Sequence, residues 1–134
     1  KRSALVKGGG AAHAREKVVD AAADRFLVVV DERKVTGTLG HDVPVEVLPA
    51  ARTAVGARLE ALGGEPRLRE ATRKDGPVVT DNGNLVLDCS LGEVTEPTRL
   101  AAELAAVPGV VEHGLFVGLA DAVHVGHPDG VRVE

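Results

Sequence analysis

A continuous apolar run at residues 26–30 (FLVVV) limits the choice of fold more than any other stretch of the sequence. Three consecutive valines disfavour a helix, because a branched β-carbon restricts the side chain against the preceding turn. A short apolar run of this kind predicts a strand buried on both faces, and such strands are typical of parallel sheets. We therefore expect an α/β fold that contains a parallel sheet.

A helix is predicted just upstream of this strand, from Ala14 to Asp24. Its apolar residues recur at helical spacing, which indicates one face that packs inward. That face consists of Ala14, Val18, Ala21 and Ala22.

A lysine and three glycines, Lys7 to Gly10, precede the helix. Glycine adopts positive φ at little cost, so a glycine loop can curl and direct backbone N–H groups at one anion. The start of the following helix adds partial positive charge. Lys7 is then a candidate cation and Glu16 a candidate base. A flexible connector followed by ordinary capping chemistry fits the same residues, so the pattern alone leaves both interpretations open.

Charged residues follow the apolar run directly, and Lys34 is among them. Ligands of parallel α/β sheets bind outside the carboxyl ends of the strands, which is where Lys34 is expected to lie, close to Lys7 and Glu16. The charge pattern by itself favours a solvated lysine at this position.

A different order of elements is predicted from Pro44 to Phe116: strand, helix, strand, strand, helix, strand. This order is typical of a ferredoxin-like α+β unit. The supporting segments are residues 43–48, 50–62, 67–71, 85–89, a helix beginning at Pro97 and a strand beginning at Val110. Two closing strands are expected at 122–125 and 131–133. We expect residues 1–43 and 117–134 to form an incomplete, Rossmann-like α/β domain and residues 44–116 to form an inserted ferredoxin-like domain.

Composition excludes several classes of function. The net charge is −4, with both signs mixed and no basic run, which argues against nucleic-acid binding. No apolar run approaches the roughly 20 residues that span a bilayer. The single cysteine, Cys89, cannot form an internal disulfide, which fits a reducing cytoplasm, and its alternation with leucines predicts a buried apolar role.

Other residues that carry chemistry give weaker signals. Asp81 and Asp88 could be imagined as paired carboxylates, but aspartate before Asn-Gly is an expected turn residue. The five histidines lack the spacing of a zinc motif, so no metal is predicted. His13 could share a helix face with Glu16, although a solvent-facing histidine is the more common case at a helix start.

Five blocks, KGGGAAHAREK, FLVVVDERK, PVEVLP, VVTDNGNLVLD and PGVVEHGLF, together resemble the ribose-5-phosphate isomerase A family in order and spacing. The resemblance runs from about Leu5 to the C-terminus. It implies an aldose–ketose isomerase of the pentose phosphate pathway that interconverts ribose 5-phosphate and ribulose 5-phosphate through an enediolate. Glu16 would carry the proton, and no cofactor or metal is implied. The implied substrate-binding residues are Lys7, Gly8, Gly9, Gly10 and Lys34. A cytoplasmic homodimer or homotetramer that binds a sugar phosphate, without nucleic acid or membrane partners, is also implied.

Part of the family pattern is missing from the sequence. Family members carry a Thr-Gly-Ser-Thr-like phosphate loop and an Asp-Gly-Ala-Asp motif upstream of the lysine–glycine loop, and neither occurs here. The sequence also lacks methionine, so we expect a further upstream segment and little or no activity from these 134 residues alone. The alternative function is a non-catalytic small-ligand-binding or oligomerisation module, which would explain residues 44–116 without the glycine loop.

Overall fold

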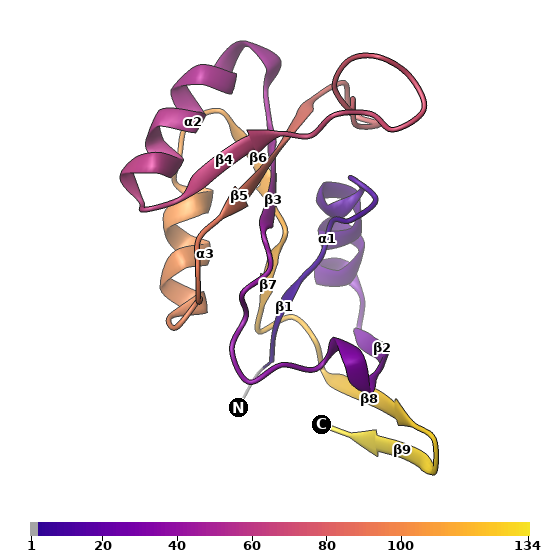
Figure 1. Cartoon of the computed structure of the whole chain (residues 1–134). Helices are drawn as coiled ribbons and strands as arrows, with labels where there is room; N and C mark the ends of the chain where they lie inside the picture. Colours follow the sequence, from indigo (N-terminus) through magenta and orange to yellow (C-terminus); the bar gives the residue numbers. More distant parts are fainter. Residues whose placement is uncertain (1–2) are drawn as a thin grey trace.

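A computed structural model describes residues 3–134 as an α/β fold, the class expected from the sequence (Figure 1). The helices are α1 (His13–Ala22), α2 (Arg52–Ala61) and α3 (Pro97–Ala105), with 3₁₀ turns η1 (Glu32–Lys34) and η2 (Pro49–Ala51). The strands are β1 (Ala4–Val6), β2 (Leu27–Asp31), β3 (Val43–Val47), β4 (Glu65–Leu68), β5 (Leu85–Ser90), β6 (Val110–His113), β7 (Leu115–Val117), β8 (Ala122–His127) and β9 (Gly130–Val133). Within residues 3–134, no helix is long and apolar enough to cross a membrane.

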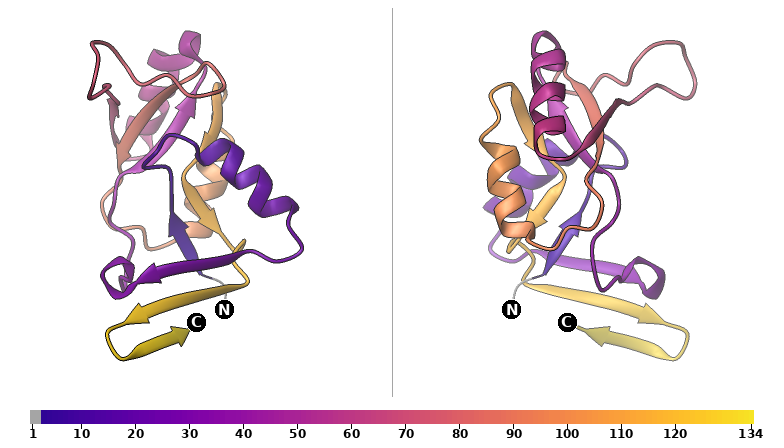
Figure 2. Two further views of the ribbon diagram at one scale, coloured as in Figure 1. Left: turned by 90° about the vertical axis from the view of Figure 1, so that its right-hand side faces the viewer. Right: turned by 60° about the vertical axis from the view of Figure 1, so that its left-hand side comes forward.

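The centre of the structure is an antiparallel four-stranded sheet with the order β4-β5-β3-β6. Helices α2 and α3 lie on one side of this sheet and α1 lies on the other, so the elements form three layers (Figures 1 and 2). The strand order is that of a ferredoxin-like unit, as predicted for this part of the chain. The domain boundaries at residues 43 and 117 stay a prediction.

The apolar core lies between the four-stranded sheet and helices α2 and α3. Alternate residues of β3 point into this layer, because successive side chains of a strand face opposite sides of the sheet. The buried members of this core are Val43, Val45, Val47, Val55, Leu59, Leu87, Cys89, Leu104, Val107 and Leu115. Cys89 is therefore a buried core residue, as predicted, and burial raises the pKa of its thiol to about 11.

Two smaller sheets pair strands from the N-terminal part of the chain with strands from its C-terminal part. Strand β1 pairs antiparallel with β7, with Leu5 opposite Phe116, and this pairing was not predicted. Strand β2 pairs in parallel with β8, and β8 pairs antiparallel with β9. The parallel pairing that we expected from residues 26–30 is thus present, with β8 as the partner of β2, but the sheet is mixed because β9 is antiparallel.

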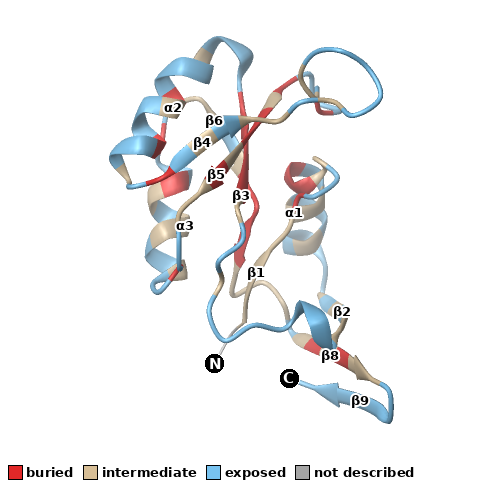
Figure 3. Ribbon diagram, viewed as in Figure 1, coloured by how far each residue is buried: buried red, intermediate tan, exposed pale blue. Residues whose placement is uncertain are grey.

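The prediction that this strand is buried on both faces is wrong. Val29 is 80% exposed and Leu27 is also exposed, whereas Val28 and Val30 are half-buried. Within the described residues, β2 pairs with β8 alone and forms an edge of the sheet. One face of the β2-β8-β9 sheet therefore stays open in this chain, as the exposed colour of β9 and parts of β2 shows (Figure 3).

The predicted inward face of α1 is also wrong. Val18, Ala21 and Ala22 are exposed, and of the predicted face only Ala14 is buried. The helix instead turns a polar stripe toward the four-stranded sheet. Its members, spaced three or four residues apart, are His13, Glu16, Lys17 and Asp20. The spacing of apolar residues predicted the wrong face because the surface that α1 covers consists of charged and amide groups rather than apolar ones.

Gly114 joins β6 to β7 where three segments meet. Its N–H donates to the carbonyl of Pro44 (2.7 Å), and its carbonyl accepts from the N–H of Lys7 (2.8 Å). A β-carbon at Gly114 would overlap the carbonyl oxygen of Lys7 and lie 2.9 Å from Pro44 Cδ. A side chain at this position would therefore separate β1 from the four-stranded sheet.

We predict that Gly114→Ala lowers the free energy of unfolding by about 1–3 kcal/mol, the usual cost of overpacking. Urea unfolding followed by circular dichroism measures the change. Gly37→Ala is the matched control, because a β-carbon there meets nothing within 4 Å. An unchanged urea midpoint for Gly114→Ala would contradict the close approach.

Candidate functional site

Lys7 follows β1 and lies between two phenylalanines. Its Nζ is 5.3 Å from the ring centroid of Phe26 and 5.3 Å from that of Phe116. These are the only Phe, Trp or Tyr residues in the sequence. An ammonium group over an aromatic ring is attracted to the negative face of the ring, so the two rings favour the observed position of the lysine charge.

The structure brings Lys7 and Glu16 together, as predicted. Lys7 Nζ lies 3.3 Å from Glu16 Oε2 and 3.6 Å from Asp20 Oδ2, and the two acidic residues are one turn apart on α1. Both of these oxygens are shielded from solvent and accept no hydrogen bond from the described residues. A carboxylate oxygen with spare acceptor capacity thus lies next to an ammonium group, an arrangement suited to proton transfer beside a developing negative charge.

The glycine loop is curled, but not by positive φ at all three glycines. Only Gly8 among them has positive φ (109°), while Ala11 has a φ of 60° and donates its N–H to the carbonyl of Gly8 (3.0 Å). A positive φ is uncommon for a residue other than glycine, and strained backbone of this kind tends to cluster at functional sites. Gly9 and Gly10 are exposed, and the space beside their α-carbons is open.

Lys34 lies just beyond the carboxyl end of β2, as predicted, where it ends a 3₁₀ turn, and its side chain is exposed. Residues 3–134 offer it no hydrogen bond or ion pair, so its convergence with Lys7 and Glu16 stays a prediction. A hollow lies beside this turn, lined among others by Asp31, Arg33 and His127.

The side chain of Lys17 extends from α1 toward strands β6 and β7, where its ammonium group is largely buried. Its Nζ donates to Glu112 Oε1 (2.8 Å), to the carbonyl of His113 (2.6 Å) and to the carbonyl of Leu115 (3.2 Å). It also lies 4.7 Å from the ring centroid of Phe116. Burial lowers the pKa of Lys17, although the hydrogen bond to Glu112 opposes this shift. No local pattern indicates this contact, because the partners of Lys17 lie 95 to 98 residues away in the sequence.

A buried carboxylate anchors the connection between β4 and β5, which reaches over the start of α1 (Figure 1). Glu46 in β3 is fully buried, and its Oε2 accepts from the side-chain amides of Asn82 (3.0 Å) and Asn84 (2.9 Å). Asn82 Oδ1 in turn accepts from Arg15 Nε (2.9 Å). Glu46 was not predicted as part of the site, although a glutamate in the middle of a valine-rich strand could have indicated it.

Asp81 and Asp88, which we considered as a pair of catalytic carboxylates, bind different partners. The carbonyl of Asp81 accepts from Arg15 (3.1 Å), and Asp88 forms a two-pronged ion pair with Arg69 (2.6 and 2.9 Å). Arg69 also donates to the carbonyls of Gly8 (3.0 Å) and Gly9 (3.1 Å). The connection between β4 and β5 thus contacts the glycine loop through Arg69 and the start of α1 through Asn82.

The expectation of a solvent-facing His13 is wrong. The imidazole is fully buried, its Nε2 lies 3.3 Å from the carbonyl of Glu112, and burial lowers its pKa. His113, next to it, is also buried, and desolvation lowers its pKa to about 4. No group of three or more His, Cys, Asp or Glu side chains in residues 3–134 could hold a metal ion.

The fold and the site together indicate the class of protein. A glycine loop that leads into a helix, beside an ammonium group, is typical of α/β proteins that bind small anions. The sequence profile described as Ribose 5-phosphate isomerase A (phosphoriboisomerase A) matches residues 1–130. The chain belongs to this family.

Relatives and solved structures agree with this assignment. Proteins named ribose-5-phosphate isomerase A from Natronomonas pharaonis and Halorubrum lacusprofundi are 70% and 68% identical over 129 residues, 96% of this chain and 57% and 54% of those proteins. The structure of ribose 5-phosphate isomerase A from Methanocaldococcus jannaschii is 43% identical with a TM-score of 0.93, covering 98% of this chain and 58% of that one. A D-ribose-5-phosphate isomerase in complex with phospho-erythronic acid is 41% identical with a TM-score of 0.93 and the same coverage. The chain therefore spans somewhat more than half the length of these relatives.

We predict that the protein loses stability as the pH falls from about 6.5 toward 4. An unfolded histidine binds a proton near pH 6.5, whereas folded His113 resists it down to about pH 4, so acid favours the unfolded chain. Each such histidine contributes at most about 1.4 kcal/mol per pH unit in this window. His13 acts in the same direction.

Urea unfolding at several pH values measures this slope. His113→Asn is the comparison, because it retains a group that can accept from the N–H of Leu115 but cannot be protonated in this range. The variant is expected to show a shallower slope. Equal slopes would contradict the assignment to His113.

Proposed function

We propose that the protein is an aldose–ketose isomerase that interconverts ribose 5-phosphate and ribulose 5-phosphate through an enediolate. The observation that carries the proposal is the 3.3 Å pair of Lys7 and Glu16 at the start of α1, in a chain that belongs to the ribose 5-phosphate isomerase A family. A bound phospho-erythronic acid, a phosphorylated sugar acid, in a related D-ribose-5-phosphate isomerase supports a sugar phosphate as the ligand.

The chemistry follows from these two groups. The Glu16 carboxylate removes the proton on C2 of the open-chain aldose, and the C–H electrons form the C1=C2 double bond while the carbonyl oxygen gains the negative charge. Glu16 then returns the proton to C1, as the proton on the C2 oxygen is transferred to the C1 oxygen. One carboxylate can perform both carbon-proton steps. The ammonium group of Lys7 lies beside the Glu16 carboxylate. It would stabilise the charged enediolate oxygens more than the neutral ground state, and this difference accelerates a reaction.

The glycine loop and Lys34 complete this proposal. Gly8, Gly9 and Gly10 would provide backbone N–H groups to the ligand, and Lys34 would provide a second cation at the carboxyl end of β2. The proposal also includes a homodimer or homotetramer in the cytoplasm, supported by the family resemblance. Sedimentation velocity of the intact protein tests the assembly.

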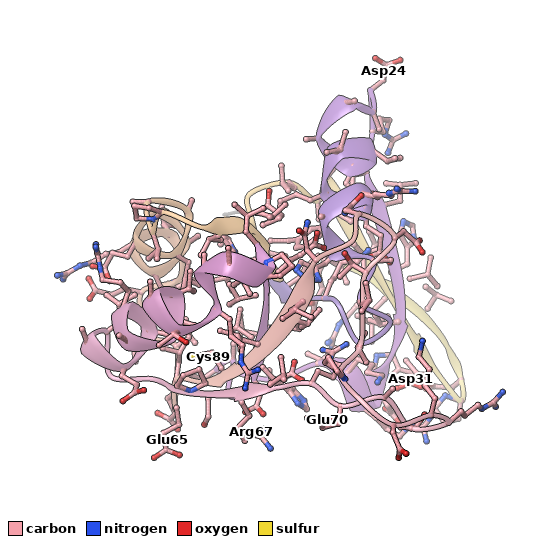
Figure 4. The ribbon with its side chains drawn as sticks, turned by 90° about the horizontal axis from the view of Figure 1, so that it is seen from above. Asp24, Asp31, Glu65, Arg67, Glu70 and Cys89 are labelled. Atoms are coloured by element: carbon pink, nitrogen blue, oxygen red, sulfur yellow. The ribbon has the colours of Figure 1, made fainter. Side chains whose placement is uncertain are left out.

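We predict that Glu16→Gln lowers kcat for ribose 5-phosphate at least about a hundredfold, because the amide cannot accept the proton. The free energy of unfolding should change by less than about 1 kcal/mol, since Glu16 is partly exposed. Coupled-enzyme kinetics on the intact protein measure the rate. Asp24→Asn is the control, because Asp24 lies beyond the end of α1 and points away from the body of the molecule (Figure 4). Parental turnover in Glu16→Gln would refute the base assignment.

Lys7→Ala separates the isomerase from the alternative, a non-catalytic module built on residues 44–116. An isomerase that uses Lys7 should bind phospho-erythronic acid at least about tenfold more weakly after this change, the loss expected for one charged hydrogen bond. Lys74→Ala, an exposed lysine in the β4–β5 connection, is the control. Calorimetry on the intact protein gives both affinities. Unchanged binding in Lys7→Ala would favour the non-catalytic module.

A further inference from the structure

Arg69 follows β4 and joins the four-stranded sheet to the lysine–glycine loop. Its Nη1 donates to the carbonyls of Gly8 (3.0 Å) and Gly9 (3.1 Å). Its Nε and Nη2 donate to the two carboxylate oxygens of Asp88 (2.9 and 2.6 Å). Both side chains are largely buried, with 18% of Arg69 and 22% of Asp88 exposed. Asp88 therefore fixes the plane of the guanidinium, and the guanidinium fixes two loop carbonyls.

The geometry of the peptide bond converts this contact into the orientation of two donors. In a planar trans peptide, the C=O of one residue and the N–H of the next point in opposite directions. No peptide bond in residues 3–134 is cis. Because Arg69 holds the carbonyls of Gly8 and Gly9, the N–H groups of Gly9 and Gly10 must point away from Arg69. Neither N–H donates to another described residue, and both glycines are exposed.

Arg69 has little capacity left to bind a ligand itself. A guanidinium has five N–H donors, and four of them serve Asp88, Gly8 and Gly9. Glycine has the largest backbone freedom of any residue, so a loop of three glycines would otherwise lose much entropy on binding. Holding such a loop in its bound conformation before the ligand arrives increases affinity.

We propose that Arg69 is a positioning residue, which orients the N–H groups of Gly9 and Gly10 toward the sugar-phosphate ligand through its hydrogen bonds to the loop carbonyls. The ligand class rests on the proposed function. Asp88 takes part by holding the guanidinium in place.

The test compares two arginines in the intact protein. Arg69→Met should weaken binding of phospho-erythronic acid about tenfold, the effect of disordering one or two hydrogen bonds to an anion. Arg67→Met is the matched control, because Arg67 lies two residues earlier at the outer edge of β4, is 68% exposed and pairs with Asp42 (Figure 4). Its affinity should stay within twofold of the parent. Parental affinity in Arg69→Met would overturn the proposal.

Two further readouts separate positioning from general structural support. Arg69→Lys keeps the charge, but a lysine cannot hold a carboxylate with two prongs and two carbonyls at once, so it should not restore affinity. In ¹⁵N spectra without ligand, the Gly9 and Gly10 amide signals should broaden or shift in Arg69→Met while core signals stay unchanged. Full rescue by lysine, or unperturbed glycine signals, would overturn the proposal.

Asp88→Asn provides a second route if Arg69→Met does not fold. It removes the charged partner of the guanidinium and should weaken binding in the same direction, whereas parental affinity would overturn the proposal. If the parent protein itself fails to bind phospho-erythronic acid and to isomerise ribose 5-phosphate, the proposed function fails. The amide signals would then still report whether Arg69 orders the loop.

Discussion

The contact between α1 and the four-stranded sheet is polar, and the rest of the site depends on satisfying the groups buried in it. A buried polar group without a partner costs roughly 1–3 kcal/mol, and a buried charge costs more. Lys17 donates to Glu112 and to two backbone carbonyls, and Glu46 Oε2 accepts from two asparagine amides, whereas Glu46 Oε1 and His13 Nδ1 have no hydrogen-bond partner among the described residues. These pairings hold α1 with its polar stripe inward. That orientation is what places Glu16 beside Lys7.

The charged and aromatic contacts of the site meet at the ammonium group of Lys7. Its ammonium group faces two carboxylates of α1 and lies between two aromatic rings. Without a ligand, the two carboxylates are its charged partners. Under the proposed function, an anionic substrate in the loop would compete with them for the same cation, while Glu16 Oε2, which accepts no hydrogen bond from the described residues, would be free to accept a proton. The curled loop beside Lys7 can bind an anion through backbone N–H groups, which carry no net charge. Binding through these groups does not require a second cation to lose its hydration.

Much of the fold was predictable, and the main errors concern which residues are buried. Alternation and β-branching located β3, β5 and β8 to within one or two residues, and Pro97 correctly marked the start of α3. The inward face of α1, the burial of β2 and the exposure of His13 were all predicted wrongly. Each of these depends on what lies opposite the element, which local hydrophobicity does not show: polar groups lie opposite α1, whereas one face of β2 stays open.

The site was predictable only where its members are close in sequence. Lys7 and Glu16 are nine residues apart, and a loop followed by a helix brings them together. Glu46, Asn82 and Arg69 reach the site from distant segments, and Arg69 contacts a loop 60 and 61 residues away. No local pattern encodes such contacts. The family resemblance supplied the reaction, because the residues alone fitted a flexible connector equally well.

The two rings beside Lys7 have a practical consequence for spectroscopy. The sequence contains two phenylalanines, Phe26 and Phe116, and neither tryptophan nor tyrosine, so no tryptophan or tyrosine signals overlap those of the two phenyl rings. Both rings flank the same ammonium group. Their ring-proton resonances in this part of the protein therefore form a native probe of ligand binding, which requires no label and no substitution.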